Sequence, residues 1–181
     1  MSLVNEQDRQ TFARLLFLRG YTLPALLRWD EALRDWQAAI PLFEGLRDAD
    51  ALARTCKEMA IMAQWQYRWE EAIGLAERGL ALVGEKPTQQ RAHLLCHLGL
   101  SHSGAGRFEK GDRILTEAEA AARHLQDSEC LGAVLFYRSA SAMFQMRVED
   151  QLTLAERSVE LLRGTRNLWD FVPALEWVHM A

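Results

Sequence analysis

MAIMAQWQYRWEEA, residues 59–72, contains a small residue, then an aromatic residue nine positions later, then two acids and an alanine. A similar order returns around three other positions, so that Trp29, Trp69, Phe108 and Val148 stand at steps of 40, 39 and 40 residues. Polar, mostly acidic residues follow each of them. A period of this length is typical of units that bury their apolar face by stacking on neighbours, so the chain is predicted to be an internal repeat.

Small residues recur at three phases of this repeat. Packed helices lie ~8–10 Å apart, and their closest approach has room only for a hydrogen or a methyl group. We therefore expect these residues to face a neighbouring helix, with Gln151 as the exception at the third phase. They are Gly20, Ala60, Gly99 and Ser139 nine residues before the aromatic position, Ala39, Gly79, Ala118 and Ser158 ten residues after it, and Ala32, Ala72 and Gly111 three residues after it.

Each repeat is predicted to be a pair of antiparallel helices, which makes the chain an all-α protein with a single domain over residues 1–181. Pro24 removes a backbone donor, so we expect the first helix to break between Gly20 and Pro24. Thr88, Ser128 and Asn167 are expected to cap later helices. The predicted pairs cover about residues 10–46, 50–84, 89–126 and 129–163, and a terminal helix covers 168–181.

This pattern resembles the tetratricopeptide repeat, from about Gln10 to Leu162, and is similar to its long-period kind in bacterial LuxR-type regulators and multidomain nucleotide cyclases. The period exceeds the usual 34 residues of that repeat, and the proline that often ends a unit is absent except at Pro87. The resemblance implies a right-handed α-solenoid whose first helices line a concave, partner-binding groove. The unfinished fifth unit favours a fragment of a longer chain.

Composition limits the partners and the compartment. Acidic residues number 25 against 21 Lys and Arg, which gives a formal charge of -4, and no basic stripe is present. We expect no nucleic-acid partner for this reason. Three cysteines, no signal peptide and no long apolar run favour a cytoplasmic protein without a membrane segment.

No residue pattern predicts catalysis, a metal site or a cofactor. His93 and His97 share a helix face, but leucines fill the positions between them where a zinc site would place its acid. Residues 103–111 are rich in glycine, but they lack the preceding strand and the Gly-Lys-Ser/Thr ending of a phosphate loop, and Gly104 and Gly106 are better explained as helix-ending residues of left-handed geometry. The acidic pairs after the aromatic position are explained by the helix dipole, because carboxylates in the first turn interact favourably with its positive end. We expect a protein that is not an enzyme.

The resemblance places the candidate partner-binding residues on the first helix of each unit. A basic end could hold carboxylates, while an aromatic and sulfur-rich end could supply apolar anchors for a peptide or protein. The groove residues are Arg14, Phe17 and Tyr21, then Arg54, Lys57, Ile61, Gln64 and Trp65, then His93, Cys96 and Leu100, and finally Phe136, Ala140, Met143 and Phe144.

Two alternatives to a simple interaction scaffold stay open at this point. The chain could be a regulatory or sensor segment of a larger bacterial signalling protein. It could also be a homodimerisation module, in which the edge around Trp169, Phe171, Leu175 and Trp177 packs against a second copy.

Overall fold

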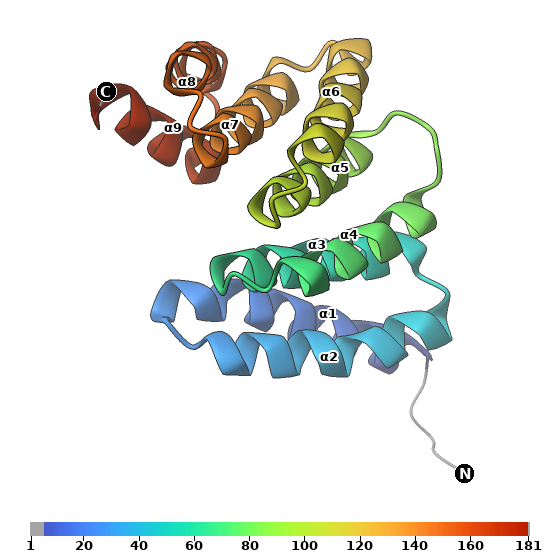
Figure 1. Ribbon diagram of the computed structural model, residues 1–181. Coiled ribbons are helices and arrows are strands. Elements are labelled where there is room, and N and C mark those ends of the chain that lie inside the picture. Colours follow the sequence, from blue (N-terminus) through green and yellow to red (C-terminus); the bar gives the residue numbers. More distant parts are fainter. Residues whose placement is uncertain (1–5, 181) are drawn as a thin grey trace.

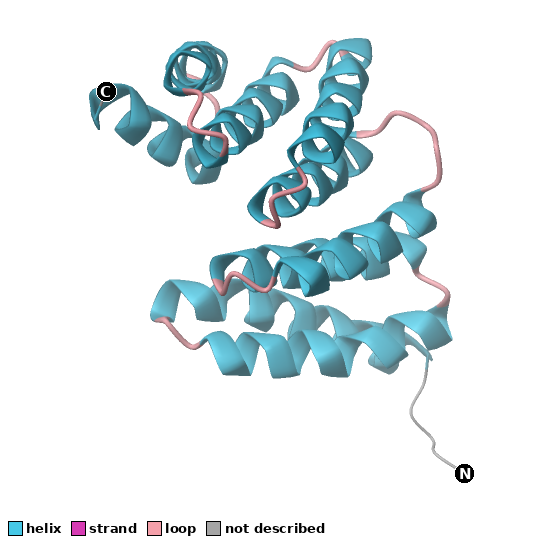
Figure 2. Ribbon diagram, viewed as in Figure 1, coloured by secondary structure: helices cyan, strands magenta, loops and turns pink. Residues whose placement is uncertain are grey.

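Residues 6–180, which this computed structural model describes, are built from helices joined by short turns (Figures 1 and 2). No strand occurs in this range. The nine α-helices of the described range are α1 (Glu6–Thr22), α2 (Trp29–Leu46), α3 (Ala49–Trp65), α4 (Trp69–Val83), α5 (Gln89–Gly104), α6 (Phe108–Leu125), α7 (Ser128–Phe144), α8 (Val148–Leu162) and α9 (Leu168–Met180), and a short 3-10 helix, η1 (Leu23–Leu26), follows α1.

The helices pack as consecutive pairs. In each pair the two helices contact each other, and the second helix also contacts the first helix of the next pair (Figure 1). The first helices α3, α5, α7 and α9 contact one another in succession. This arrangement is an all-α helical repeat, as the period predicted. None of the helices in residues 6–180 has both the length and the hydropathy needed to cross a membrane.

The turn inside each pair repeats one backbone geometry. The residue two positions before each aromatic or apolar repeat position has a positive φ: Leu27 at 59°, Tyr67 at 57°, Gly106 at 78° and Met146 at 57°. The next amide donates to a carbonyl five residues earlier, which is the hydrogen bond of a Schellman turn. These bonds run from Arg28 to Leu23 (3.1 Å), from Arg68 to Ala63 (2.8 Å), from Arg107 to His102 (2.8 Å) and from Arg147 to Ala142 (3.0 Å).

The small residues of the repeat lie where helices approach most closely. A Cβ atom added to Gly99 of α5 would lie 2.6 Å from Cγ of Leu115 and 3.1 Å from the backbone oxygen of Gly111, both in α6. Gln151, the exception, instead accepts a hydrogen bond on its carbonyl from Ser139 Oγ at 2.8 Å. The predicted packing phases are confirmed, because the alanines and serines at these phases are all buried: Ala32, Ala39, Ala60, Ala72, Ala118, Ser139 and Ser158.

Most of the predicted helix boundaries are also confirmed. Helix α1 ends before Pro24, and the chain continues as η1. The side chain of Thr88 accepts from the Arg91 amide at 3.1 Å, and Asn167 Oδ1 accepts from the Asp170 amide at 3.2 Å. The cap of α7 was predicted wrongly at Ser128, which is the first helical residue. The carboxylate one residue earlier accepts from the Cys130 amide at 3.0 Å instead, so Asp127 is the cap.

The two glycines predicted to end α5 have different roles. Gly106 has the left-handed backbone that was expected, with a φ of 78°. Gly104 is the last residue of α5, as predicted, but it has no left-handed backbone, and that part of the prediction was wrong. A Cβ atom on Gly104 would lie 2.7 Å from the Trp69 ring, so this glycine makes room for an aromatic side chain rather than for a turn.

The acids that follow the aromatic position lie in the first turns of the second helices, as predicted from the helix dipole. Three of them also pair with the arginine three residues earlier, at the N-cap. Exposed pairs of this kind add little to stability, because water and salt screen the charges. The pairs are Arg28 with Glu31 (2.6 Å), Arg68 with Glu71 (2.5 Å) and Arg147 with Asp150 (3.0 Å).

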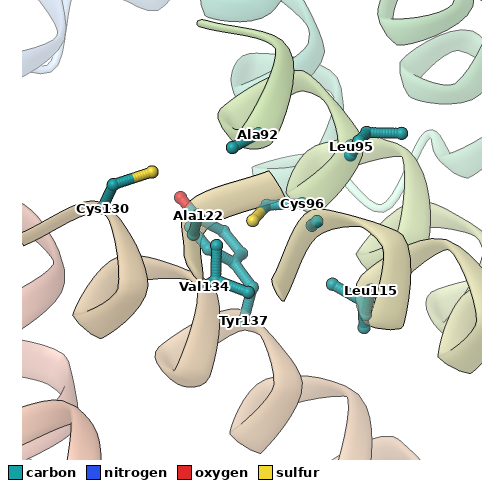
Figure 3. Packing of buried hydrophobic residues seen from close by; sticks show 9 residues of the cluster. Ala92, Leu95, Cys96, Leu115, Ala122, Cys130, Val134 and Tyr137 are labelled. Atoms are coloured by element: carbon teal, nitrogen blue, oxygen red, sulfur yellow. The ribbon is translucent and has the colours of Figure 1, made fainter. Parts of the chain in front are cut away.

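The largest buried cluster joins α5, α6 and α7 around Leu115, Val134 and Tyr137 (Figure 3). Cys96 and Cys130 belong to it, and Cys96 is 0% exposed. The placement of Cys96 in the groove was therefore wrong, because its side chain faces the neighbouring helices. Burial raises the pKa of the Cys130 thiol to about 12 and raises that of Cys96 as well. Both are packing residues.

Candidate ligand-binding cavity

A cavity of about 510 Å³ opens on the face formed by the first helices. Its walls come from α3, α5, α7 and α9, with the α3–α4 turn and Trp69, the first residue of α4, at one end. We call this space the aromatic cavity, after its dominant side chains. Its lining residues are Ile61, Gln64, Trp65, Tyr67, Trp69, His97, Leu100, Phe136, Tyr137, Ala140, Met143, Phe144, Leu168, Trp169, Val172, Pro173 and Trp177.

Ring contacts tie the walls of the aromatic cavity together. Helix α9 brings Trp169 against Trp65 of α3 and Trp177 against α7, so residues far apart in the chain meet across the opening. Edge and tilted arrangements of this kind are favourable for aromatic pairs. The ring centroids are 6.1 Å apart for Trp65 and Trp169, 5.6 Å for Trp69 and Phe144, and 5.1 Å for Phe136 and Trp177.

A second space of about 420 Å³ adjoins the first and carries most of the polar groups. The two spaces share Ile61, Trp65, His97, Tyr137 and Trp169 as walls. We call this second space the polar pocket. Its other lining residues are Tyr21, Pro24, Ala25, Trp29, Trp36, Lys57, Glu58, Met62, His93, Glu129, Asn167 and Asp170.

The wall shared by the two spaces is fixed by a buried hydrogen-bond network. Gln64 Nε2 donates to the carbonyl of His97 and to Ser101 Oγ, both at 2.8 Å. Since the amide nitrogen of Gln64 already donates these two hydrogen bonds, its Oε1 accepts the hydrogen bond from His97 Nδ1–H at 3.1 Å. The His97 ring then stands edge-on to Tyr137, with centroids 4.8 Å apart. Gln64 therefore positions other groups and is itself only 7% exposed.

Burial changes the protonation of the groups around the polar pocket. It lowers the pKa of His93 to about 4, with the Lys57 cation as a second cause. It lowers the pKa of His97 well below its ordinary value for the same reasons. Burial raises the pKa of the Asp170 carboxyl, although Asn167, Tyr137 and Lys57 each act to lower it. At neutral pH both imidazoles are therefore uncharged.

Most of the groove residues predicted from the sequence line one of these two spaces. The aromatic cavity brings together seven of the predicted groove residues, and Ala140 lies with them. The polar pocket takes three more. The seven are Ile61, Gln64, Trp65, Leu100, Phe136, Met143 and Phe144, and the three are Tyr21, Lys57 and His93.

The remaining three, Arg14, Phe17 and Arg54, line a separate cleft of about 250 Å³ between the first two units. The basic end expected to hold carboxylates is also partly neutralised by the chain's own acids. Arg54 pairs with Asp50, and Lys57 pairs with the adjacent Glu58 at 2.9 Å.

The four α9 residues that were predicted as a self-association edge lie in two different environments. Trp169 and Trp177 line the aromatic cavity, and Trp169 is also exposed to solvent. Phe171 and Leu175 are half-buried and do not line it. The four residues therefore do not form one common face, and the two tryptophans are placed to contact whatever enters the cavity.

Sequence reasoning missed several wall residues. Tyr67 lies in the α3–α4 turn, and Trp69 was assigned only as a marker of the repeat. The predicted groove residues include neither His97 nor Tyr137, although His97 follows a predicted groove residue, His93, by one helical turn. Spacing of i and i+4 puts two side chains on one face, and this signal could have found His97.

No protein-family model matches this chain, and no curated protein is recognisably similar to it. Within residues 6–180, no three or more His, Cys, Asp or Glu side chains come together as metal ligands would.

Proposed function

We propose that the chain is a non-catalytic, tetratricopeptide-like interaction scaffold, a right-handed superhelix of helix pairs, that binds a partner protein through the aromatic cavity. In this proposal the occupant is an extended peptide segment with apolar side chains. The site needs no cofactor and no nucleic acid.

One observation carries the proposal: large aromatic side chains remain exposed together around a hollow. Trp65 is 61% exposed and Trp169 is 58% exposed, although the two rings touch. Clustered exposed apolar surface of this kind marks interaction sites. Tryptophan and tyrosine are also the side chains whose removal most often weakens protein interfaces.

The size and the chemistry of the cavity agree with this occupant. A volume of about 510 Å³ lies within the range of sites that enclose a ligand. Such a site can take the apolar side chains of a short segment but not a folded domain. The polar groups of the segment would meet the polar pocket at one end.

The test is a selection of random peptides on the immobilised protein, followed by affinity measurements with the enriched peptides by fluorescence polarisation. Trp65→Ala removes an exposed wall of the cavity, so we expect a loss of about tenfold or more in affinity. Phe12→Ala is the matched control, because Phe12 is 56% exposed and lines neither space. Circular dichroism checks that both variants keep their helices.

Enriched peptides that bind the Trp65→Ala variant as tightly as the wild type would overturn the proposal. Sedimentation of the free protein gives a second decisive result. If the mass doubles with concentration and Trp169→Ala restores the monomer, the cavity is filled by a second copy and not by a partner peptide.

A further inference from the structure

We infer that the polar pocket is a cation site: Asp170 receives an organic ammonium or guanidinium group, and aromatic rings flank it. The inference rests on the proposed function, since the cation would be a Lys or Arg side chain of the segment held in the aromatic cavity. It adds a charge preference that the apolar walls alone do not supply.

The buried carboxylate is the first observation. Asp170 is 4% exposed and lines the polar pocket. Asn167 Nδ2 donates to its Oδ2 at 2.8 Å, but Oδ1 has no partner with hydrogen-bond geometry in the described part of the chain. A buried polar atom without a partner is unfavourable and rare in folded proteins. Asp170 lines the polar pocket, but Oδ1 itself has almost no exposed surface in the free protein, so a cation would reach it by displacing the side chains that cover it.

The charges around the pocket favour a cation over an anion. Helix α3 contributes Lys57 and Glu58, which already pair with each other at 2.9 Å. Helix α7 contributes Glu129 and the Tyr137 hydroxyl, which acts to lower the pKa of the Asp170 carboxyl, and α9 contributes Asp170. His93 and His97 of α5 are uncharged at neutral pH, because burial lowers their pKa. The Lys and acidic side chains that line the pocket are therefore one cation, Lys57, and three acids, Glu58, Glu129 and Asp170.

The aromatic rings are the second observation. Trp29 and Trp65 stack with centroids 6.4 Å apart, and Trp65 also meets Trp169 at 6.1 Å. All three line the polar pocket with Asp170. The faces of tryptophan rings attract ammonium and guanidinium groups, most strongly where water is excluded. A carboxylate beside such rings combines two forms of cation recognition.

The raised pKa of Asp170 agrees with this role. The carboxylate is destabilised by burial, and a cation beside it would stabilise the charged form. Binding of a cation should therefore release protons from any Asp170 that is still protonated, and affinity should weaken as the pH falls.

The test uses three probes of equal chain length: hexylammonium chloride, 1-hexanol and sodium hexanoate. Tryptophan fluorescence reports binding, since all six tryptophans of the chain line one of the two spaces. We expect hexylammonium to bind about tenfold more tightly than hexanol, and hexanoate more weakly than either. Asp170→Asn, which is isosteric and keeps an acceptor for Asn167, should reduce the preference for the ammonium to about twofold or less.

Glu149→Gln is the matched control, because it removes one exposed acid from the first turn of α8, outside both spaces. It should leave the preference unchanged. Equal affinity for the three probes, no binding of the amine, or an equal effect of the two substitutions would each overturn the cation site. The peptide selection is judged separately through Trp65→Ala, so apolar binding without any charge preference would refute this inference alone.

Discussion

Gly111→Ala tests whether the helices of the third unit touch through their backbones. Gly111 lies in the first turn of α6 and is buried. A Cβ atom there would lie 2.8 Å from the backbone oxygen of Gly99 and 3.1 Å from the backbone nitrogen of Ser103, and it would also clash with the Ser103 hydroxyl. Backbone atoms of a packed helix cannot move aside as a flexible side chain can, so α5 and α6 would have to separate.

Two effects of opposite sign set the magnitude. Alanine is a better helix former than glycine by ~1 kcal/mol. Overpacking of a close-packed site costs ~1–3 kcal/mol, and contacts with backbone atoms place this site at the upper end of that range. We therefore expect a net loss of about 2 kcal/mol, which lowers the melting temperature of a chain of this length by about 4–8 °C.

Gly74→Ala supplies the control within the same fold. Gly74 lies in α4, and a Cβ atom added to it would meet nothing within 4 Å. Only the difference in helix propensity then remains, so this variant should melt about 2–4 °C above the wild type. Thermal unfolding followed by circular dichroism measures both variants. If Gly111→Ala melts with or above Gly74→Ala, the close approach of α5 and α6 is refuted.

Two further predictions concern titration and thiol chemistry. The pKa of His93 is about 4 in the folded protein and ~6.5 when unfolded, so the unfolded chain binds more protons between these values and stability falls as the pH drops from 6.5 to 4. His93→Gln should remove up to about 3 kcal/mol of this loss of stability in acid. Urea unfolding at pH 7 and pH 4.5 measures the difference. An unchanged pH dependence would show that His93 is solvated in the folded state. Cys56, Cys96 and Cys130 are buried with raised pKa values, so Ellman's reagent should modify them only at the rate of unfolding, and rapid labelling of the native protein would contradict that packing.

The repeat itself could be predicted from the sequence because it depends on short-range spacing. A small residue at the same position of every repeat, such as Ala60 or Gly99, indicates where another helix packs closely, and this does not depend on the rest of the fold. The helix break before Pro24 is equally local. The cap of α7 shows the limit of such reasoning. Asp127 and Ser128 are both good capping residues, and only the backbone decides which one precedes the first turn.

The cavity could be predicted only in part. Residues such as Ile61, Leu100 and Phe136 share the face of first helices, and their phase is visible in the sequence. The contribution of α9 depends on how its helix is set against α7 and α8, which is a tertiary property that periodicity does not specify. The sequence therefore predicts Trp169 and Trp177 only as part of an edge, whereas in the fold both line the aromatic cavity.

The contact between Trp65 and Trp169 has a consequence for how the stack responds to force and heat. In an open stack each unit senses only its neighbours, so the two ends loosen independently. Here α3 touches α9 across the groove, 104 positions later in the chain, without passing through α5 and α7. The Trp65–Trp169 contact therefore couples the last helix, α9, directly to the second unit, so that a displacement of α9 also changes the contacts of α3.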